Sequence, residues 1–245
     1  MQAPHPPLKD YYAQEADRNG WVRGLFDQTA GDYDRVERAM ALGSGPWYRR
    51  RALQQAGLRP GMRVLDVGVG TGLTAREAAR LVGATGQVTG VDPSAGMMKS
   101  AILPATVNLL LGKAEALPVP SDTVDFVSMG YALRHVADFS VVFQEFKRVL
   151  VPGGQICILE ITCPEGRLQR LLLKAYMRGL VPVLARCIAR HRDVPKLMRY
   201  YWDTIEACAS PDVIMGKMRD AGFVEVERIV SLGIFSEYRA RSPVA

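Results

Sequence analysis

The chain has 245 residues, of which 48% are hydrophobic and 23% are charged. This length and composition are typical of one large globular α/β domain, or of one domain with an appendage. No apolar run reaches the ~18–20 residues that a membrane-spanning helix needs. The formal net charge of +6 is distributed over many predicted helices, so we expect a solvated surface and no nucleic-acid partner.

The cysteines and the N-terminus indicate a reducing compartment. Cys157, Cys163, Cys187 and Cys208 form no CxxC pair and have no His/Cys spacing typical of a metal site. The first dozen residues contain no apolar segment and no cleavage pattern of a signal peptide. We therefore predict reduced thiols, no metal and a cytoplasmic location.

The N-terminal quarter of the chain reads as helical. Residues 1–12 contain Pro4, Pro6 and Pro7 and are expected to form a loose leader. Residues 15–57 then follow a helical pattern broken by turns, with the breaker GSGP at 43–46. We predict that residues 1–57 form a leader and a helical cover on the main domain.

From Arg63 onwards, strand and helix patterns alternate. Apolar runs at 62–68, 87–92, 107–117, 124–133 and 152–162 predict strands, and the segments between them, such as 74–82 and 138–150, have helical periodicity. This alternation predicts a parallel sheet with right-handed crossovers. The strands are almost continuously apolar, as expected when helices cover both faces.

The alternation stops after Ile161. Residues 167–192 predict a long basic helical region broken near Pro182, and residues 195–209 predict a further helical piece. Residues 210–223 predict a capped helix, and 224–241 a closing pair of strands. We therefore assign residues 58–245 to one α/β domain with a helical insertion at about 165–208.

The stretch VLDVGVGTGLTA, residues 64–75, places a glycine-rich turn directly after the first strand. Its glycines, Gly68, Gly70 and Gly72, allow a sharp turn and close approach of a ligand to the backbone. The third glycine departs from the GxGxxG spacing of dinucleotide-binding folds. Asp92 follows Gly72 by 20 residues, a distance at which such folds place an acid on a ribose diol.

The segments DVGVGTG, GVDPS, GKAEALPVPSDTVDFV and FKRVLVPGG resemble the successive motifs of class I S-adenosylmethionine-dependent methyltransferases. The resemblance implies a Rossmann-like, seven-stranded, mostly parallel sheet that binds S-adenosyl-L-methionine. It implies that the glycine turn approaches the amino-acid end of the cofactor, that Asp66 faces its ammonium group and that Asp92 accepts from both ribose hydroxyls. The cofactor residues that it implies are Asp66, Gly68, Gly70, Gly72, Asp92, Ala114, Glu115, Ser128 and Met129.

One position departs from this pattern. Family members have Asp or Asn just before the Ala-Glu pair, where this chain has Lys113. An ammonium group has only donors, so it cannot accept from the adenine amino group. We expect Lys113 to point outward and adenine recognition to depend on backbone groups.

The flanking segments resemble the C-methyltransferases of ubiquinone and menaquinone biosynthesis over most of residues 25–240. The resemblance implies that Tyr33 and Arg134 lie beside the hydroxyl of a phenolic ring whose carbon attacks the methyl group. An arginine is a poor base but stabilises a developing phenolate. His135 replaces the asparagine of that family and is a candidate general base.

The acceptor and the partners stay open at this level. We expect a small apolar aromatic or quinone-type acceptor and C-methylation; the alternatives are O- or N-methylation of a secondary metabolite, amino-group donation from the cofactor, or a non-catalytic assembly partner. The insertion predicts either a lid that rests on anionic lipid or a basic solvated helix whose apolar side lies in the core or in a homodimer interface. Its cations are Arg167, Arg170, Lys174, Arg178, Arg186, Arg190 and Arg192.

Overall fold

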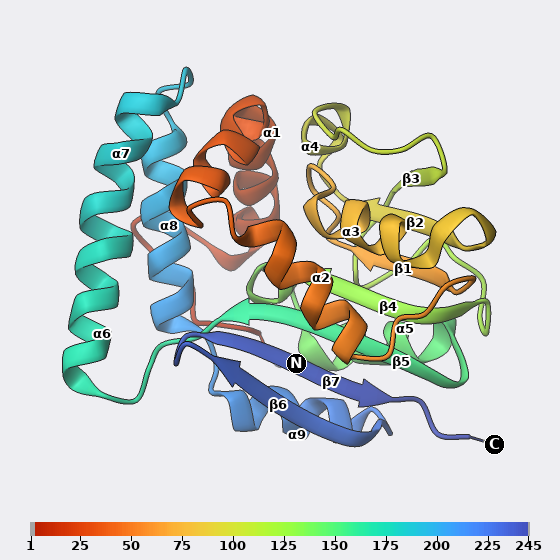
Figure 1. Cartoon of the computed structure of the whole chain (residues 1–245). Helices are drawn as coiled ribbons and strands as arrows, with labels where there is room; N and C mark the ends of the chain where they lie inside the picture. Colours follow the sequence, from red (N-terminus) through yellow and green to blue (C-terminus); the bar gives the residue numbers. More distant parts are fainter. Residues whose placement is uncertain (1–2, 245) are drawn as a thin grey trace.

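The computed structural model describes residues 3–244, without the side chain of Glu15. Its centre is a seven-stranded sheet in the order β3-β2-β1-β4-β5-β7-β6 (Figure 1). β7 is antiparallel to both of its neighbours, and the other pairings are parallel. The strands are β1 (Arg63–Val67), β2 (Gln87–Asp92), β3 (Val107–Leu111), β4 (Val124–Gly130), β5 (Leu150–Ile161), β6 (Val224–Ser231) and β7 (Phe235–Arg241). The predicted fold is confirmed.

Helices cover the sheet because its strands are apolar on both faces. On one face α2 (Gly45–Gln55) and α3 (Leu73–Val82) pack over Val64, Phe126 and Leu159. On the other, α5 (Phe139–Val149) and α9 (Pro211–Asp220) cover Val127, Ile156 and Ile158. The two edge strands are less covered, since Leu109, Leu110 and Leu111 are exposed in β3 and Val224 and Val230 in β6.

A helical cap with its own hydrophobic core lies beside the sheet. It comprises α1 (Glu15–Met40), α6 (Arg167–Lys174), a π-helical stretch at Ala175–Leu180, α7 (Val181–Ile188) and α8 (Val194–Ala207). Figure 1 shows α1 between the α7–α8 pair and the short helix α4 (Ala95–Lys99). The predicted break near Pro182 takes the form of the π-helical stretch, because proline has no N–H to donate to the preceding turn.

The N-terminal leader is packed rather than loose. His5 and Tyr12 are buried, and the Ala209 amide donates to the Pro4 carbonyl over 2.7 Å. The Tyr11 hydroxyl donates to Asp203 on α8 over 2.5 Å. The predicted loose leader is therefore wrong for the part of it that the structure describes, because its aromatic residues find partners on α8.

No helix within residues 3–244 combines the length and the apolar character needed to cross a membrane. The same residues contain no group of three or more His, Cys, Asp or Glu side chains placed to hold a metal ion.

Candidate active site

A cavity of about 350 Å³ lies between the carboxyl ends of β1, β2 and β4 and the helical cap. The glycine turn, the end of β2, the loop after β3 and the end of β4 line it from the sheet. Residues of α1, α2 and α8 line it from the other side. Ligands of open α/β sheets bind at this edge, where the loops after neighbouring strands diverge.

The glycine turn leaves β1 in a conformation that requires glycine. Gly68, Gly70 and Gly72 have φ of +68°, +55° and +85°, a region that other residues rarely adopt. A Cβ on Gly68 would lie 2.5 Å from the Ala132 Cβ, and one on Gly72 would lie 2.6 Å from Leu103. Gly68 and Gly70 line the cavity, whereas Gly72 does not and instead begins α3.

Asp92 ends β2 and is held at the wall of the cavity. Its Oδ2 accepts from the Gly70 amide over 2.7 Å, and its Oδ1 accepts from the Ser94 amide over 2.8 Å. Burial raises the pKa of Asp92 to about 6. Each oxygen keeps a further lone pair, so the carboxylate can still accept from a diol, as the sequence predicts.

Asp66 does not line the cavity. It is 1% exposed at the end of β1, where its Oδ1 accepts from the Ser128 hydroxyl over 2.6 Å. Burial raises the pKa of Asp66 to about 7. Asp66 and Ser128 join β1 to β4, and Asp66 Oδ2 is buried with no hydrogen-bond partner among the described residues. That Asp66 faces the cofactor ammonium stays a prediction.

The loop after β3 brings Lys113, Ala114 and Glu115 to the cavity. Glu115 is fixed because its Oε1 accepts from the Ala137 amide over 2.5 Å. Lys113 is exposed, and its carbonyl accepts from the Ala116 amide. Met129, at the end of β4, also lines the cavity. Lys113 is exposed yet lines the cavity, so the prediction that it points away from the ligand is not supported. Recognition of adenine through backbone groups stays a prediction.

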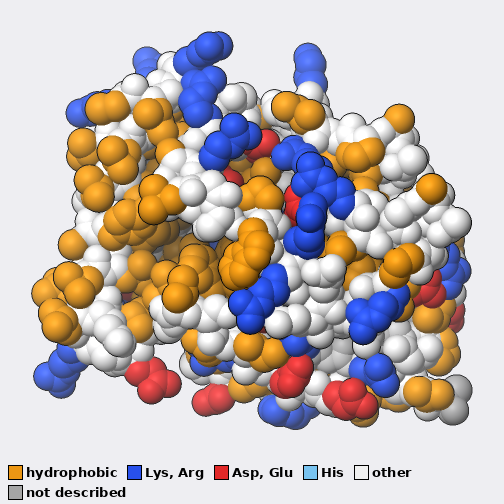
Figure 2. All heavy atoms as spheres, viewed as in Figure 1, with side chains coloured by type: hydrophobic (Ala, Val, Ile, Leu, Met, Phe, Trp, Pro, Cys, Tyr) orange, Lys and Arg blue, Asp and Glu red, His pale blue; other side chains and the backbone are white. Residues whose placement is uncertain are grey.

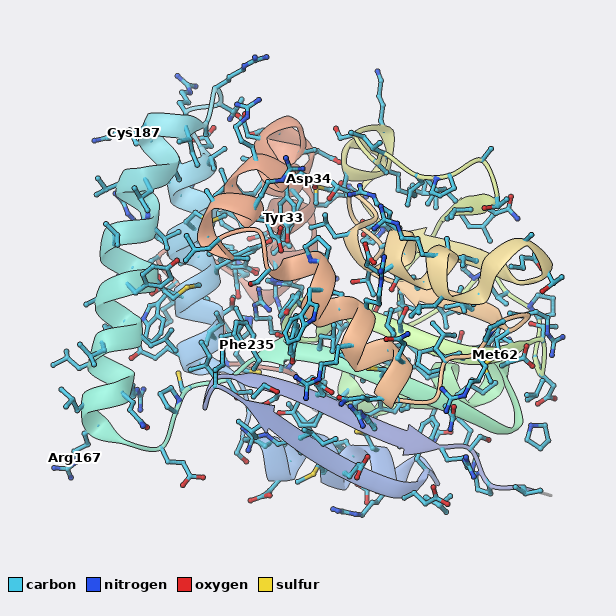
Figure 3. The ribbon with its side chains drawn as sticks, viewed as in Figure 1. Tyr33, Asp34, Met62, Arg167, Cys187 and Phe235 are labelled. Atoms are coloured by element: carbon cyan, nitrogen blue, oxygen red, sulfur yellow. The ribbon has the colours of Figure 1, made fainter. Side chains whose placement is uncertain are left out.

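Of the three predicted catalytic residues, Tyr33 and His135 line the cavity and Arg134 does not. Figure 3 marks Tyr33 on α1, which lies over the carboxyl ends of the strands. Arg134 follows β4 in a 3₁₀ turn and is 2% exposed. The structure thus brings the three residues together at one end of the cavity, but only two of them can touch a ligand directly.

Arg134 forms a buried ion pair inside the protein. Its Nη1 lies 2.6 Å from Glu160 Oε2 on β5, and its Nε donates to the Thr204 hydroxyl over 3.2 Å. The guanidinium carbon lies 4.9 Å from the centre of the Tyr201 ring. Removing either member of such a buried pair is strongly unfavourable, so Arg134 holds β5 and α8 together.

Tyr201 connects Arg134 to the cavity. Its hydroxyl donates to the Tyr33 hydroxyl over 2.8 Å, which leaves the Tyr33 proton free to donate to a ligand. Burial raises the pKa of Tyr33 above its usual range, although the neighbouring Tyr201 hydroxyl and the Arg134 charge oppose the rise. Tyr33 is therefore a neutral donor at the cavity wall at neutral pH.

His135 presents a neutral imidazole. Its ring stacks on Tyr200 at 5.5 Å and meets Phe26 edge-on at 5.4 Å. The Nδ1 atom lies 3.3 Å from the Tyr200 hydroxyl, whereas Nε2 is buried with no hydrogen-bond partner among the described residues. Burial, reinforced by the Arg134 charge, holds the pKa of His135 well below its usual range. In the tautomer whose proton lies on Nδ1, where it donates to the Tyr200 hydroxyl, Nε2 can accept a proton or a hydrogen bond.

Two acids of α1 that the sequence analysis did not single out hold this helix on the site. Asp27 Oδ1 accepts from the Ser94 hydroxyl over 2.5 Å and from the Gly96 amide over 2.8 Å. Asp34, marked in Figure 3, accepts from the Thr71 hydroxyl in the glycine turn. Asp27 and Asp34 are two helical turns apart and share a face, a spacing that the segment FDQTAGDYD already contains.

Comparisons with known proteins find related sequences and related structures. The sequence model of the ubiE/COQ5 methyltransferase family matches residues 13–240. The ubiquinone/menaquinone biosynthesis C-methyltransferase UbiE of Shewanella pealeana is 31% identical over 88% of each chain. The demethylmenaquinone methyltransferase of Symbiobacterium thermophilum is 33% identical over 95% of this chain and 93% of its own.

Solved structures share the fold. A S-adenosylmethionine-dependent methyltransferase from Aquifex aeolicus superposes with a TM-score of 0.61 at 22% identity, over 85% of this chain and 97% of its own. A phosphoethanolamine N-methyltransferase of Haemonchus contortus, in complex with S-adenosylhomocysteine, has a TM-score of 0.65 at 19% identity, over 90% of this chain and 60% of its own.

Proposed function

Because the chain belongs to the ubiE/COQ5 methyltransferase family, we propose that it methylates a ring carbon of a hydroxylated, quinone-type aromatic acceptor. It is an S-adenosylmethionine-dependent methyltransferase. The observation that carries the proposal is the composition of the cavity wall opposite the glycine turn. There, Phe26 and Val22 supply apolar surface, and Tyr33 and His135 supply one donor and one acceptor.

This wall suits a phenolic ring. Apolar and aromatic side chains bind the ring faces, and a few placed polar groups orient its hydroxyl. His135 Nε2 accepts the hydroxyl proton, and the Tyr33 hydroxyl donates to the phenolate oxygen that remains. The burial cost of the imidazolium is offset by the adjacent phenolate, because opposite charges stabilise each other where water is excluded.

The cofactor residues occupy the other end of the same cavity. Asp92 has lone pairs for the ribose hydroxyls, and Gly68 and Gly70 admit the ligand to the backbone. When bound, S-adenosylmethionine would supply an electrophilic methyl group and leave as S-adenosylhomocysteine, and the ring carbon that takes the methyl group would lose its proton as the aromatic ring is restored. Met129 and Ala132 also line the cavity and limit the water around the reacting atoms.

The test uses cofactor with an isotopically labelled methyl group and two matched quinols. One quinol has an unsubstituted ring carbon beside a hydroxyl, and the other carries a methyl group there. We expect label on the ring carbon of the first and none on the second. Label on oxygen would replace the proposal by O-methylation, which the same histidine could serve. No incorporation into either quinol, with the cofactor bound, would overturn the proposed class of acceptor.

We further propose that the outer face of the α6–α7 helix rests on an anionic membrane, where a quinone precursor dissolves. Figure 2 shows hydrophobic side chains gathered over α6 and α7, with basic side chains at both ends. The apolar residues are Leu168, Leu171, Leu172, Leu180, Val183 and Leu184, which are 41–68% exposed. An exposed apolar stripe flanked by cations is typical of interfacial helices.

The structure refines the sequence prediction of a basic lid. Arg170 and Lys174 pair with Glu206, and Arg178 pairs with Asp203, so these cations are partly neutralised by α8. Four other cations have no ion pair among the described residues and can contact anionic lipid headgroups: Arg167, Arg186, Arg190 and Arg192. The cavity lining includes no residue from 167–192, so α8, through Tyr201, covers the site instead.

Sedimentation with phosphatidylglycerol-containing vesicles tests the membrane contact. We expect binding that weakens at high salt and that the substitution Leu171→Glu abolishes. Val141→Glu is the matched control, since Val141 is an exposed residue of α5 outside this face. Absence of binding, together with a dimer that Leu171→Glu dissociates, would assign the face to a homodimer interface.

A further inference from the structure

A buried arginine that neither the sequence analysis nor the proposed chemistry uses lies at the cavity wall. Arg49 comes from α2 and is 4% exposed, yet it lines the cavity. Its Nη1 lies 2.8 Å from Glu37 Oε1, and its guanidinium carbon lies 5.3 Å from the centre of the Tyr131 ring. Its Nε is buried with no hydrogen-bond partner among the described residues.

The Arg49 guanidinium is held in place although its buried Nε has no hydrogen-bond partner among the described residues. A Cβ on Gly45 would lie 2.6 Å from Nη1, so the glycine of the GSGP turn makes room for it. A guanidinium has five donors in a planar fork, and the hydrogen bond to Glu37 uses one of them. Because an unpaired donor in a buried site is unfavourable, this arrangement fits an anion with two oxygens.

The neighbours of Arg49 in the cavity wall indicate which anion it could bind. It shares the wall with the glycine turn and with Tyr131, which follows β4. The Arg49 charge also acts on Asp66 at the end of β1, where it opposes the rise in the pKa of that acid. Asp92 and Glu115, by contrast, line the cavity from β2 and the loop after β3. The cavity wall thus carries the acids Asp92 and Glu115 and, on a different element, the buried cation Arg49.

S-adenosylmethionine matches this division of charge. Its ribose offers hydroxyl donors, which suit Asp92, and its amino-acid end carries one carboxylate. We infer that Arg49 binds the α-carboxylate of the cofactor through its fork, with Glu37 and Tyr131 holding the guanidinium in position. The other cations of the cavity wall, Arg23 and Lys113, are exposed, so water competes for them more strongly.

The inference concerns the cofactor and does not rest on the identity of the acceptor. Calorimetry with two ligands tests it without turnover: S-adenosylhomocysteine, and S-adenosyl-3-thiopropylamine, which lacks only the carboxylate. In the unmodified protein we expect S-adenosylhomocysteine to bind at least about tenfold more tightly. Equal affinities there would overturn the inference before any variant is made.

Variants of Arg49 and Arg50 test which residue causes the preference for the ligand with the carboxylate. Arg49→Met is expected to lower the affinity for S-adenosylhomocysteine at least about tenfold and to leave the affinity for the amine analogue nearly unchanged. The preference for the ligand with the carboxylate then disappears. Arg50→Met is the matched control, since Arg50 is the next residue of α2 but pairs with Glu77 outside the cavity. It should keep the preference.

Two results would contradict the assignment. If Arg49→Met lowers the affinity for both ligands equally, Arg49 supports the fold of the site and does not bind the carboxylate. If it weakens neither, the carboxylate binds elsewhere. Should Arg49→Met unfold, Arg49→Lys keeps the test open, because a lysine retains the charge without the fork and should reduce the preference without removing it.

Discussion

Arg134 is tied to Glu160, Thr204 and Tyr201, and none of its atoms reaches the cavity. Its contribution to the reaction is therefore that of a positioning residue. It fixes the Tyr201 ring, whose hydroxyl fixes Tyr33, and it places a positive charge behind the Tyr33 hydroxyl. A resemblance in sequence could pair Arg134 with Tyr33, but it could not reveal that a second tyrosine stands between them.

Arg134→Ala is expected to lower turnover at least about tenfold, which corresponds to about 1.4 kcal/mol of barrier, with little change in cofactor affinity. It should also lower the free energy of unfolding by about 3 kcal/mol, because Glu160 is left buried without its partner. The double variant Arg134→Met/Glu160→Met separates the two effects. It should recover stability in urea denaturation without recovering turnover, and recovery of both would remove Arg134 from the mechanism.

Tyr201→Phe removes the hydroxyl that connects Tyr201, which packs on Arg134, to Tyr33. The Tyr33 hydroxyl then loses its donor and the orientation that this donor imposes, so turnover should fall about tenfold. Steady-state kinetics measures the change, with calorimetry for the cofactor. Tyr176→Phe is the control, since its hydroxyl bonds the Met40 carbonyl away from the cavity. Equal rates in both variants would contradict a role for Tyr201.

At the scale of elements, α1 is the wall that completes the site. The residues of α1 that line the cavity are Asn19, Gly20, Val22, Arg23, Phe26 and Tyr33. Asp27 attaches this helix to the loop after β2, and Asp34 attaches it to the glycine turn. Docking of α1 and the shape of the cofactor site are therefore coupled.

Asp27→Ala removes the two hydrogen bonds that Ser94 and Gly96 donate to Asp27. It is expected to lower the affinity for the cofactor several-fold. Amide hydrogen exchange in α1 should become faster in the absence of ligand, because the helix loses an anchor to the sheet. Asp17→Ala, at an exposed position of the same helix, should change neither quantity. Unchanged exchange in Asp27→Ala would mean that hydrophobic packing alone holds α1.

At the scale of the molecule, two buried carboxylates make stability and cofactor binding respond oppositely to pH. The pKa of Asp66 is raised to about 7 and that of Asp92 to about 6, both by burial. Between pH ~4 and 7 the folded chain binds more protons at these sites than the unfolded chain, whose ordinary Asp pKa is ~3.9. Their contribution to the free energy of unfolding therefore falls as the pH rises through this window.

Cofactor affinity is expected to change in the other direction. Protonation turns one oxygen of Asp92 into a donor and removes its charge, so that it accepts less strongly from the two ribose hydroxyls. Affinity should therefore fall below about pH 6 and stay level above it. Calorimetry across pH 5–8 measures this, and Asp92→Asn should bind weakly at every pH. Urea denaturation of the ligand-free protein provides the second readout. Asp66→Asn should stabilise it more at pH 8 than at pH 5, and a constant difference would contradict the raised pKa of Asp66.

The amino-acid sequence by itself determined the alternating elements, the glycine turn and Asp92. These depend on local causes: apolar periodicity sets strands and helices, positive φ requires glycine, and a carboxylate that ends a strand lies at the edge of the sheet. Tyr33 and His135 were also predicted to be at the site, from the resemblance of their segments to those of the C-methyltransferase family. The structure places both at the cavity wall.

The tertiary structure alone decided which side chains face the cavity. Asp66 lies at the predicted strand end but turns to Ser128, and Arg134 turns to Glu160, a residue 26 positions away. Arg49, Tyr201 and Asp27 reach the site from helices whose docking depends on contacts between distant segments. A buried charge takes the partner that packing brings to it, and no local pattern of residues encodes which partner that is.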